Sequence, residues 1–239
     1  MLAVVDYRIS PQAKGALERM GHLVLALPPH PSLPVPVSAH PDMLLFFASD
    51  CIFCTKSYQS IAKNELERLY EYTKKPLCTV EGVVSECYPN DILLNAAPIG
   101  KRLFCNVAHT ARELAAHPAY EIVNVRQGYA KCSTLPVGEH ALITEDASIA
   151  RAAQQTGLDV LQVESRAVTL KGYDTGFLGG AASFSPYVSI PQILFCGNLD
   201  RHPNSSEIRQ FCNSHGIEPI SLSNEALTDV GTIFLLPME

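Results

Sequence analysis

Charged side chains recur at one position of a repeated segment, and their chemistry suits the binding of a small cation. The residues at this position are Asp42, Asp91, Lys131, Asp174 and Asp229. Carboxylates that converge on one cavity repel one another, and they can pair bidentately with a guanidinium group. The pattern therefore predicts a ring of four acids and one base that binds a guanidino, amine or amino-acid-like molecule. The alternative is that each Asp caps a turn by accepting backbone N–H bonds.

Two residue types suited to catalysis stand beside this ring. His40 and Asp42 form a His-x-Asp pattern, in which a carboxylate can orient the imidazole and keep it basic. Cys132 follows Lys131, whose positive charge would favour the reactive thiolate. We therefore predict His40, Asp42 and Cys132 as catalytic residues. Two alternatives stay open: His40 could lie on the surface in a proline-rich segment, and strand alternation could turn Cys132 away from the side that Lys131 faces.

A glycine-rich stretch at residues 179–184 could let the backbone approach a ligand closely. Gly179 and Gly180 have no side chain to keep a ligand away, although glycines in a strand can equally mark a bulge. Ser183 follows them, and no base adjoins it in the sequence, which argues against a nucleophile. We assign Gly179, Gly180 and Ser183 to the predicted substrate-binding site.

The elements that would position these residues form an internal repeat of strand, helix, glycine and strand. The clearest copies cover residues 3–27, 140–163 and 192–222, and weaker copies cover 51–80 and 101–125. In the first copy Ser10 is a good N-cap, Pro11 suits the first helical position, and Gly21 ends the helix. A further strand-like segment, which carries the charged residue, closes each unit. The predicted repeats therefore cover about 1–48, 49–99, 100–138, 139–188 and 189–239.

Five such units predict one domain over residues 1–239 with radial packing. A strand–helix–strand–strand unit cannot bury its faces alone, and the stable arrangement places sheets inside and helices outside. The predicted fold class is α/β, a five-bladed α/β-propeller with pseudo-fivefold ββαβ-type repeats. An open doubly wound sheet is the alternative, but it would have one strand per helix, whereas here two strand candidates follow each helix.

The repeat and several short motifs resemble the pentein superfamily, which includes arginine deiminases, amidinotransferases and dimethylarginine hydrolases. The resemblance spans nearly the whole chain and is closest to a bacterial family of unknown activity assigned to that fold. The motifs that carry it are Gly172–Ala181, Thr228–Ile233, Lys131-Cys132 and His140–Thr144.

The resemblance implies a cysteine nucleophile, a histidine in a His-x-Asp context, and carboxylates that hold a guanidinium group. This sequence departs from that pattern in two ways. The cysteine that typically follows a late glycine-rich stretch is missing, and Ser183 stands near its place. The His-x-Asp match, His40 and Asp42, lies in the first repeat rather than in a central one. The catalytic apparatus is therefore displaced, permuted or missing.

Three functions are compatible with these residues. The first is a hydrolase or amidinotransferase-like enzyme that acts on a guanidino or related C–N small molecule. The second is a non-catalytic protein that binds a small molecule at a degenerate pentein site. The third is a structural or partner-binding propeller whose pore is filled.

Composition excludes several other classes. The chain has 239 residues, 18% of them charged, and a net charge of −6, with no basic cluster longer than a pair. Nucleic acid and an anionic membrane surface are therefore not expected as partners. No apolar run approaches the roughly 20 residues that span a bilayer, and no signal peptide is apparent. We expect a soluble, cytoplasmic protein, and the sequence leaves its oligomeric state open.

The eight cysteines read as buried, reduced thiols, since several lie inside apolar runs. Cys51 and Cys54 are the only close pair, and neither a second pair nor histidines at ligand spacing accompany them. We therefore expect no metal. No phosphate-binding glycine loop is present either, so no cofactor is expected.

Overall fold

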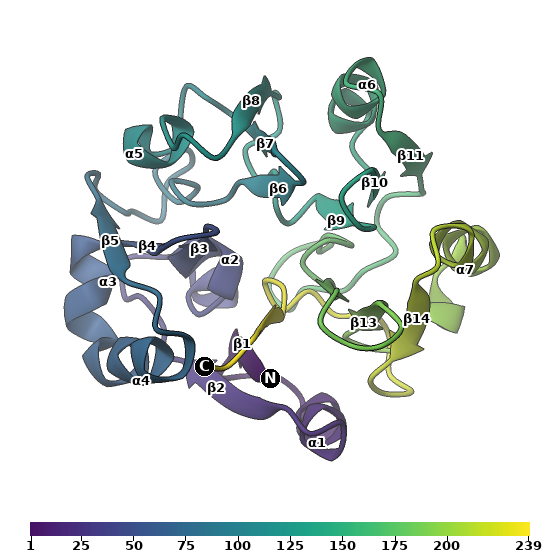
Figure 1. Cartoon of the computed structure of the whole chain (residues 1–239), viewed down its shortest axis with the longest axis horizontal. Coiled ribbons are helices and arrows are strands. Elements are labelled where there is room, and N and C mark those ends of the chain that lie inside the picture. The colour runs from purple at the N-terminus through teal and green to yellow at the C-terminus, as the bar shows by residue number, and fades with distance from the viewer.

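Five small sheets surround a common centre in the computed structural model, which describes residues 1–239 (Figure 1). Each sheet has three strands, an innermost, a middle and an outer one. In that order they are β15 (Phe234–Leu236), β1 (Leu2–Asp6) and β2 (Leu23–Leu27); β3 (Leu45–Phe47), β4 (Ile52–Thr55) and β5 (Leu77–Val80); β6 (Ala97–Ile99), β7 (Arg102–Cys105) and β8 (Glu121–Asn124); β9 (Thr134–Pro136), β10 (Ala141–Thr144) and β11 (Asp159–Gln162); and β12 (Ala182–Ser185), β13 (Gln192–Phe195) and β14 (Glu218–Ser221).

The middle and outer strands of every sheet run parallel, and the innermost strand is antiparallel to the middle one. Parallel neighbours need a crossover, which a helix supplies on the outside of the ring. The crossover helices are α1 (Pro11–Arg19), α3 (Lys56–Ile61), α4 (Lys63–Thr73), α5 (Arg112–Ala115), α6 (Ala147–Gln155) and α7 (Ser205–Ser214). A short helix, α2 (Pro41–Leu44), and two 3-10 turns, η1 (Val35–Val37) and η2 (Leu199–Arg201), complete the elements.

The first helix shows why these segments fold as they do. The Ser10 hydroxyl accepts a hydrogen bond from Ala13 N, and Pro11 occupies the first turn, as predicted. Gly21 follows the helix with φ +82°, a conformation that costs a glycine little. Leu17 packs without exposure into the core between helix and sheet.

The sheets are offset from the expected repeats. The closing segment of each expected repeat supplies the innermost strand of the following sheet: β3 pairs with β4, and β9 pairs with β10. At the other end of the chain, β15 pairs with β1 through Leu2↔Leu236 and Val4↔Phe234. The two ends of the chain therefore share one sheet, which closes the ring (Figure 1).

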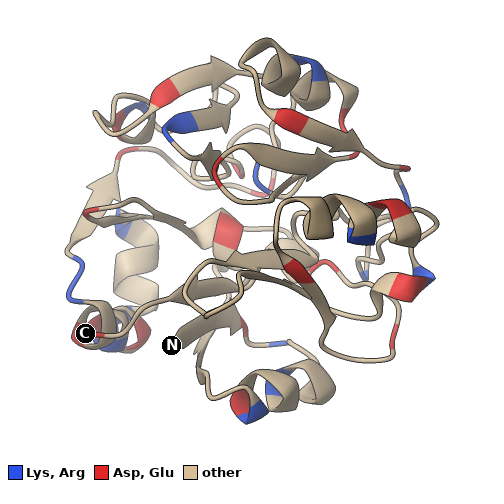
Figure 2. Ribbon diagram, turned by 45° about the vertical axis from the view of Figure 1, so that its right-hand side comes forward, with Lys and Arg blue, Asp and Glu red and all other residues tan.

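Apolar residues fill the space between neighbouring sheets and under the helices in five clusters. Acidic and basic residues are mixed around the outside of the ring (Figure 2). No helix has both the length and the apolar character needed to cross a membrane.

Candidate functional site

Five residues, one ahead of each innermost strand, meet at the centre of the ring. They are Asp42, Asn95, Lys131, Gly179 and Thr232, and each lies two or three residues before β3, β6, β9, β12 or β15. We call this set the hub. Because an innermost strand begins near the axis, the residue just before it is delivered to the same place in every sheet.

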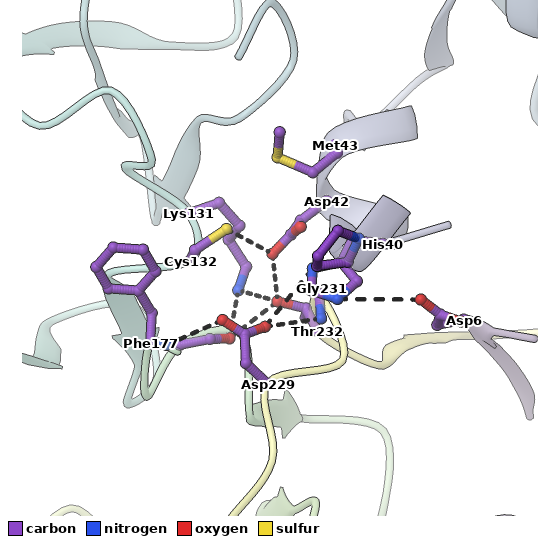
Figure 3. Close-up of polar contacts among 12 residues, drawn as sticks. Asp6, His40, Asp42, Met43, Lys131, Cys132, Phe177, Asp229, Gly231 and Thr232 are labelled. Atoms are coloured by element: carbon purple, nitrogen blue, oxygen red, sulfur yellow. Dashed lines mark hydrogen bonds and ion pairs between the residues drawn. The ribbon is translucent and has the colours of Figure 1, made fainter. Parts of the chain in front are cut away.

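Hydrogen bonds join the hub into one network, and Figure 3 shows the part around Asp42, Lys131 and Thr232. Lys131 Nζ donates to Thr232 Oγ1 at 2.8 Å and to the Gly179 carbonyl at 3.2 Å. Thr232 Oγ1 lies 3.1 Å from Asp42 Oδ2. Asn95 donates to the Asp42 carbonyl at 3.2 Å and accepts from Lys131 N at 2.8 Å. The network therefore ties all five blades together through polar groups.

The hub buries charges that are only partly compensated. Asp42 and Lys131 are 1% and 5% exposed. Burial raises the pKa of Asp42 and lowers the pKa of Lys131, while the attraction between the two acts in the opposite direction on each. Asp42 Oδ1 has no hydrogen-bond partner. A cation that reached this carboxylate would therefore find an acceptor without competing donors.

Cys132 lies against the Asp42 carboxylate. Its Sγ donates to Asp42 Oδ2 at 3.2 Å and accepts from Asn95 Nδ2 at 3.0 Å. Burial raises the pKa of the Cys132 thiol well above its usual value, and Asp42 and Asp229 raise it further. The expectation that Lys131 would favour the thiolate is therefore wrong: loss of hydration and two carboxylates outweigh the neighbouring ammonium group.

His40 is held by a different carboxylate from the one expected. Its Nδ1 lies 3.7 Å from Asp229 Oδ1 and its Nε2 lies 3.9 Å from Asp6 Oδ2. Burial lowers the pKa of His40, although both carboxylates oppose this effect, so the imidazole is mainly neutral at pH 7. A side chain on Gly231 would collide with His40, so the glycine lets the backbone pack against the ring.

Asp229 is fixed by backbone donors. Its Oδ2 accepts from Phe177 N at 2.9 Å and its Oδ1 accepts from Gly231 N at 3.0 Å. Burial raises the pKa of Asp229, and these donors and His40 lower it. The carboxylate therefore has a fixed direction between His40 and the cavity described next.

A cavity of about 190 Å³ brings Cys132, His40 and Asp229 onto one surface. The rest of its wall is mostly apolar and aromatic: Val37, Met43, Tyr129, Leu170, Tyr173, Thr175 and Phe177. A more open depression of about 510 Å³ adjoins it through His40 and Asp229, and Asp6 and Arg8 lie along it. A planar cation would meet carboxylate and aromatic faces here together.

Lys131 and Cys132 face different spaces, as strand-like alternation predicted. Lys131 lines a separate depression of about 430 Å³ together with Ser183 and Thr232, and this depression shares no residue with the Cys132 cavity. In Figure 3 Lys131 and Cys132 approach the centre from one side, and Asp42 and His40, both at α2, approach it from the other. The hub therefore separates two cavities.

Besides Asp229, which lies beside His40, two residues of the predicted ring lie outside the hub. The Asp174 side chain is 93% exposed and lies 3.8 Å from Arg166, so its assignment to the site is wrong. Asp91 is buried but accepts from the Tyr129 hydroxyl at 2.6 Å, and its side chain makes no hydrogen bond to the hub. Both errors have the same physical reason: the chain runs on for several residues after these acids before the innermost strand starts, and the strand start sets the position of the hub.

The glycine-rich stretch contacts protein rather than open space. A side chain on Gly179 would collide with the Cys132 and Thr134 carbonyls, and one on Gly180 would collide with the Asp229 carboxylate. Ser183 donates to the Ile233 carbonyl and lines only the Lys131 depression. The two glycines therefore admit close neighbours from the protein itself, and the approach of their backbone to a ligand stays a prediction.

Several residues of the site were not identified from the sequence. Asn95 and Thr232 occupy the hub positions that were predicted for Asp91 and Asp229. Tyr129 and Phe177 form the aromatic wall of the Cys132 cavity. Thr232 has φ +69°, which is rare for a β-branched residue. Backbone strain of this kind tends to occur at functional positions. Aligning the repeats on the innermost strand instead of on the acids would have found Asn95 and Thr232.

The buried Glu145 carboxyl, beside the site, tests how far burial shifts the pKa of an acidic group here. Its Oε1 accepts from Leu178 N at 3.0 Å, its Oε2 has no partner, and burial raises its pKa from 4.5 to about 7. The folded protein holds a proton that the unfolded chain releases near pH 4.5. The stabilisation from this proton is therefore complete below that pH and is lost as the pH rises to about 7.

Replacing Glu145 with Gln should raise the free energy of unfolding at pH 8 by about 2–3 kcal/mol, since each tenfold change in proton affinity is worth about 1.4 kcal/mol. At pH 4.5 the same variant should be no more stable than the parent. Urea unfolding at the two pH values measures this difference. Glu86→Gln, at an exposed position, is the control, and an equal gain at both pH values would contradict the assignment.

Solved structures with this fold are enzymes that modify guanidino groups. A dimethylarginine dimethylaminohydrolase mutant from Pseudomonas aeruginosa, complexed with citrulline, is 12% identical with a TM-score of 0.57, and the match covers 93% of this chain and 92% of that one. An amidinotransferase of saxitoxin biosynthesis from Microseira wollei is 10% identical with a TM-score of 0.53, covering 88% and 72%. Agmatine deiminase from C. jejuni is 8% identical with a TM-score of 0.50, covering 95% and 78%.

These neighbours all have the pentein fold, and the resemblance inferred from the repeats is confirmed at the level of fold. No curated protein matches the sequence. One family model, described as a family of unknown function (DUF6873), matches residues 4–234. Since that match covers nearly the whole chain, this pentein-fold protein belongs to the DUF6873 family.

Proposed function

We propose that this protein is an enzyme that cleaves a C–N bond of a small guanidino compound, with Cys132 as nucleophile, His40 as base and Asp229 as the group that holds the cation. One observation carries the proposal: Cys132, His40 and Asp229 line one cavity of about 190 Å³. Nucleophile, base and orienting carboxylate are the parts that covalent catalysis needs, and here they converge from three different blades.

The cavity suits a guanidinium group for electrostatic reasons. The Asp229 carboxylate can accept N–H bonds, and Tyr129 and Phe177 offer aromatic faces to a planar cation. The volume is that of a small ligand group, so the remainder of a longer substrate would extend past His40 into the open depression. Recognition therefore centres on the cationic head.

The chemistry follows from the protonation states. A bound guanidinium places a positive charge beside Cys132, and that charge lowers the pKa of the thiol. As the S–H proton passes to Asp42 Oδ2, sulfur bonds to the guanidinium carbon; one C–N bond then breaks, and the leaving amine takes that proton. Neutral His40 next removes a proton from water, for a hydrolase, or from an acceptor amine, for an amidinotransferase. Attack of that oxygen or nitrogen on the carbon breaks the C–S bond, and the proton that His40 took passes to the sulfur, which restores the thiol.

The second candidate is a protein that binds the cation without turning it over. The neutral thiol of Cys132, with its pKa raised by burial and by two carboxylates, favours this candidate. A pocket that keeps its carboxylate and aromatic wall binds a cation whether or not the thiol reacts. The two functions therefore differ in the reactivity of one sulfur atom.

A matched pair of reagents separates them. 2-Chloroacetamidine is cationic and 2-chloroacetamide is its neutral counterpart. We expect Cys132 to be alkylated at least tenfold faster by the cationic reagent, because the pocket binds it and the bound charge favours the thiolate. Peptide mass spectrometry locates the modified cysteine, and arginine or agmatine should slow the reaction.

Two variants serve as controls. Cys132→Ser should remove the fast reaction, and Cys87→Ser, at an exposed site, should leave it unchanged. Equal rates with both reagents at Cys132 would exclude the enzyme. If arginine or agmatine nevertheless raises the melting temperature of the protein, the binding function remains.

A further inference from the structure

Metal-ligating side chains gather at a second place, away from the Cys132 cavity. Asp50, Cys51 and His117 bring one ligand atom each within 4.8 Å of one another, and no other group of three such residues in the chain does so. Cys78 is a fourth donor nearby, because it packs against the same core cluster as Cys51 and pairs with Phe53, two residues from Cys51 along the neighbouring strand. These four side chains offer two sulfurs, one imidazole nitrogen and one carboxylate oxygen.

The four side chains come from two neighbouring blades. Asp50 and Cys51 directly precede β4, and Cys78 lies in β5 of the same sheet. His117 lies two residues after α5, which belongs to the next sheet. Cys51 is 5% and His117 9% exposed, while the Asp50 side chain is 68% exposed. The cluster therefore stands at the seam between blades, with one open side through which an ion could enter.

The imidazole already points at the cluster. His117 Nε2 lies 3.1 Å from Asp50 Oδ1, and the His117 ring packs edge-on against Phe53 at 5.6 Å. His117 Nδ1 accepts a long hydrogen bond of 3.3 Å from Ala119 N. To ligate through Nε2 the neutral ring must carry its proton on Nδ1, so metal binding would exchange this weak bond for the metal bond.

A disulfide does not explain the two sulfurs. Cys78 is paired with Phe53, so Cys51 is two residues out of register with it. Two residues along a strand and one strand spacing across give a Cα–Cα distance of about 8 Å, beyond the roughly 7 Å that a disulfide tolerates. A metal ion bridges more widely separated thiolates, because about 2.3 Å of metal–sulfur bond lies on either side of it.

Geometry and charge both suit zinc. Donors around tetrahedral zinc lie about 3.3–3.8 Å apart, so the ligand atoms of Asp50, Cys51 and His117, which lie within 4.8 Å of one another, need to contract only slightly, and the Cys78 thiol must turn toward them. Sulfur, imidazole and carboxylate form a borderline-soft donor set, which zinc prefers over magnesium or calcium. Lys75, whose Nζ donates to the Ala48 carbonyl, is the cation that acts on Asp50 and Cys51, and it would offset the excess negative charge of the loaded site.

We propose that these residues form a zinc site that joins the second and third blades; its ligands are Asp50, Cys51, Cys78 and His117. The site shares no residue with the Cys132 cavity and stands independently of the proposed function. Its sequence signal is weak because the ligands are spread over residues 50–117 and because Cys54, the apparent partner of Cys51, faces another core.

Cobalt titration of the full chain, stripped of metal with a chelator, tests the site. We expect one equivalent of Co²⁺ to bind, with an intense thiolate-to-cobalt absorption band and the strong visible bands of tetrahedral cobalt, and Zn²⁺ to displace it. Zinc at a hundredfold excess over its dissociation constant should raise the melting temperature by roughly 5–10 °C. Absence of stoichiometric binding to the parent chain overturns the proposal, whatever the variants do.

Variants locate the ion. Cys78→Ser, at a half-buried position, and His117→Gln should each weaken binding at least tenfold and remove the zinc-induced rise in melting temperature. Cys54→Ser and Cys132→Ser should bind as the parent does, which separates this site from the close cysteine pair and from the candidate active site. Loss of binding in Cys132→Ser with retention in both Cys78→Ser and His117→Gln would place the ion elsewhere and overturn the proposal.

Discussion

Replacing Lys131 with Met should lower the free energy of unfolding by about 3–5 kcal/mol, the usual consequence of leaving a buried charge without its opposite charge. The Lys131 ammonium is the buried cation that faces Asp42, and it also satisfies Thr232 and the Gly179 carbonyl. Methionine fills a similar volume but leaves an uncompensated carboxylate at the centre of five blades. For a chain of this size the melting temperature should fall by roughly 10 °C.

A double-mutant cycle identifies the cause. Asp42→Asn in the Lys131→Met background removes the stranded charge, so the double variant should regain part of the lost stability rather than show the sum of two losses. Lys171→Met, at an exposed position, should change stability by less than about 0.5 kcal/mol. If Lys131→Met is no more destabilising than Lys171→Met, the hub does not hold the ring together.

The architecture could be predicted because short sequence signals mark where its helices and strands begin and end. Ser10, Pro11 and Gly21 mark the start and the end of a helix through effects within one or two turns, and similar signals recur along the chain. Repetition then restricts the arrangement, since identical units that cannot bury their faces alone must pack on one another. The ring follows from these two facts without knowledge of any side-chain contact.

The hub was only half predictable, because its position depends on where an innermost strand begins. Asp42 and Lys131 were found because each lies three residues before such a strand, whereas Asp174 lies eight residues before β12. Strands of three or four residues give little periodic signal, and irregular turns precede them here. Asn95 and Thr232 were missed since neither carries the charge on which the repeats were aligned.

The roles of His40 and Cys132 depended on tertiary contacts that sequence neighbours do not fix. Asp42 was expected to orient His40 but instead accepts from Cys132, and Asp229, far along the chain, lies beside the imidazole. Lys131 was expected to ionise Cys132, yet complete burial and two carboxylates act against the thiolate. Burial is a property of the whole fold, so its effect on pKa could not be read from adjacent residues.

Alkylation of Cys132 by neutral 2-chloroacetamide should rise about 100-fold between pH 7 and pH 9 without levelling off. The reason is the raised pKa of the thiol: burial, Asp42 and Asp229 hold it well above its usual value, so the thiolate fraction grows tenfold with each pH unit over this range. An unburied thiol with a pKa of about 8.5 levels off near pH 9 under the same conditions. Mass spectrometry of the Cys132 peptide gives the rate, and circular dichroism verifies that the protein stays folded.

The Asp42→Asn variant gives the electrostatic part of this effect. The substitution keeps the size of the side chain and removes the negative charge 3.2 Å from the sulfur, so the pKa of Cys132 should fall and alkylation at pH 7 should become faster. With cationic 2-chloroacetamidine the alkylation rate of the parent protein should level off at a lower pH than with the neutral reagent. The positive charge of the bound reagent stabilises the thiolate and so offsets the rise in pKa that the carboxylates cause. A rate that already levels off below pH 8 with the neutral reagent would mean that Lys131 dominates after all. The thiol would then be ionised before any ligand enters, and activation by a bound cation would not be needed.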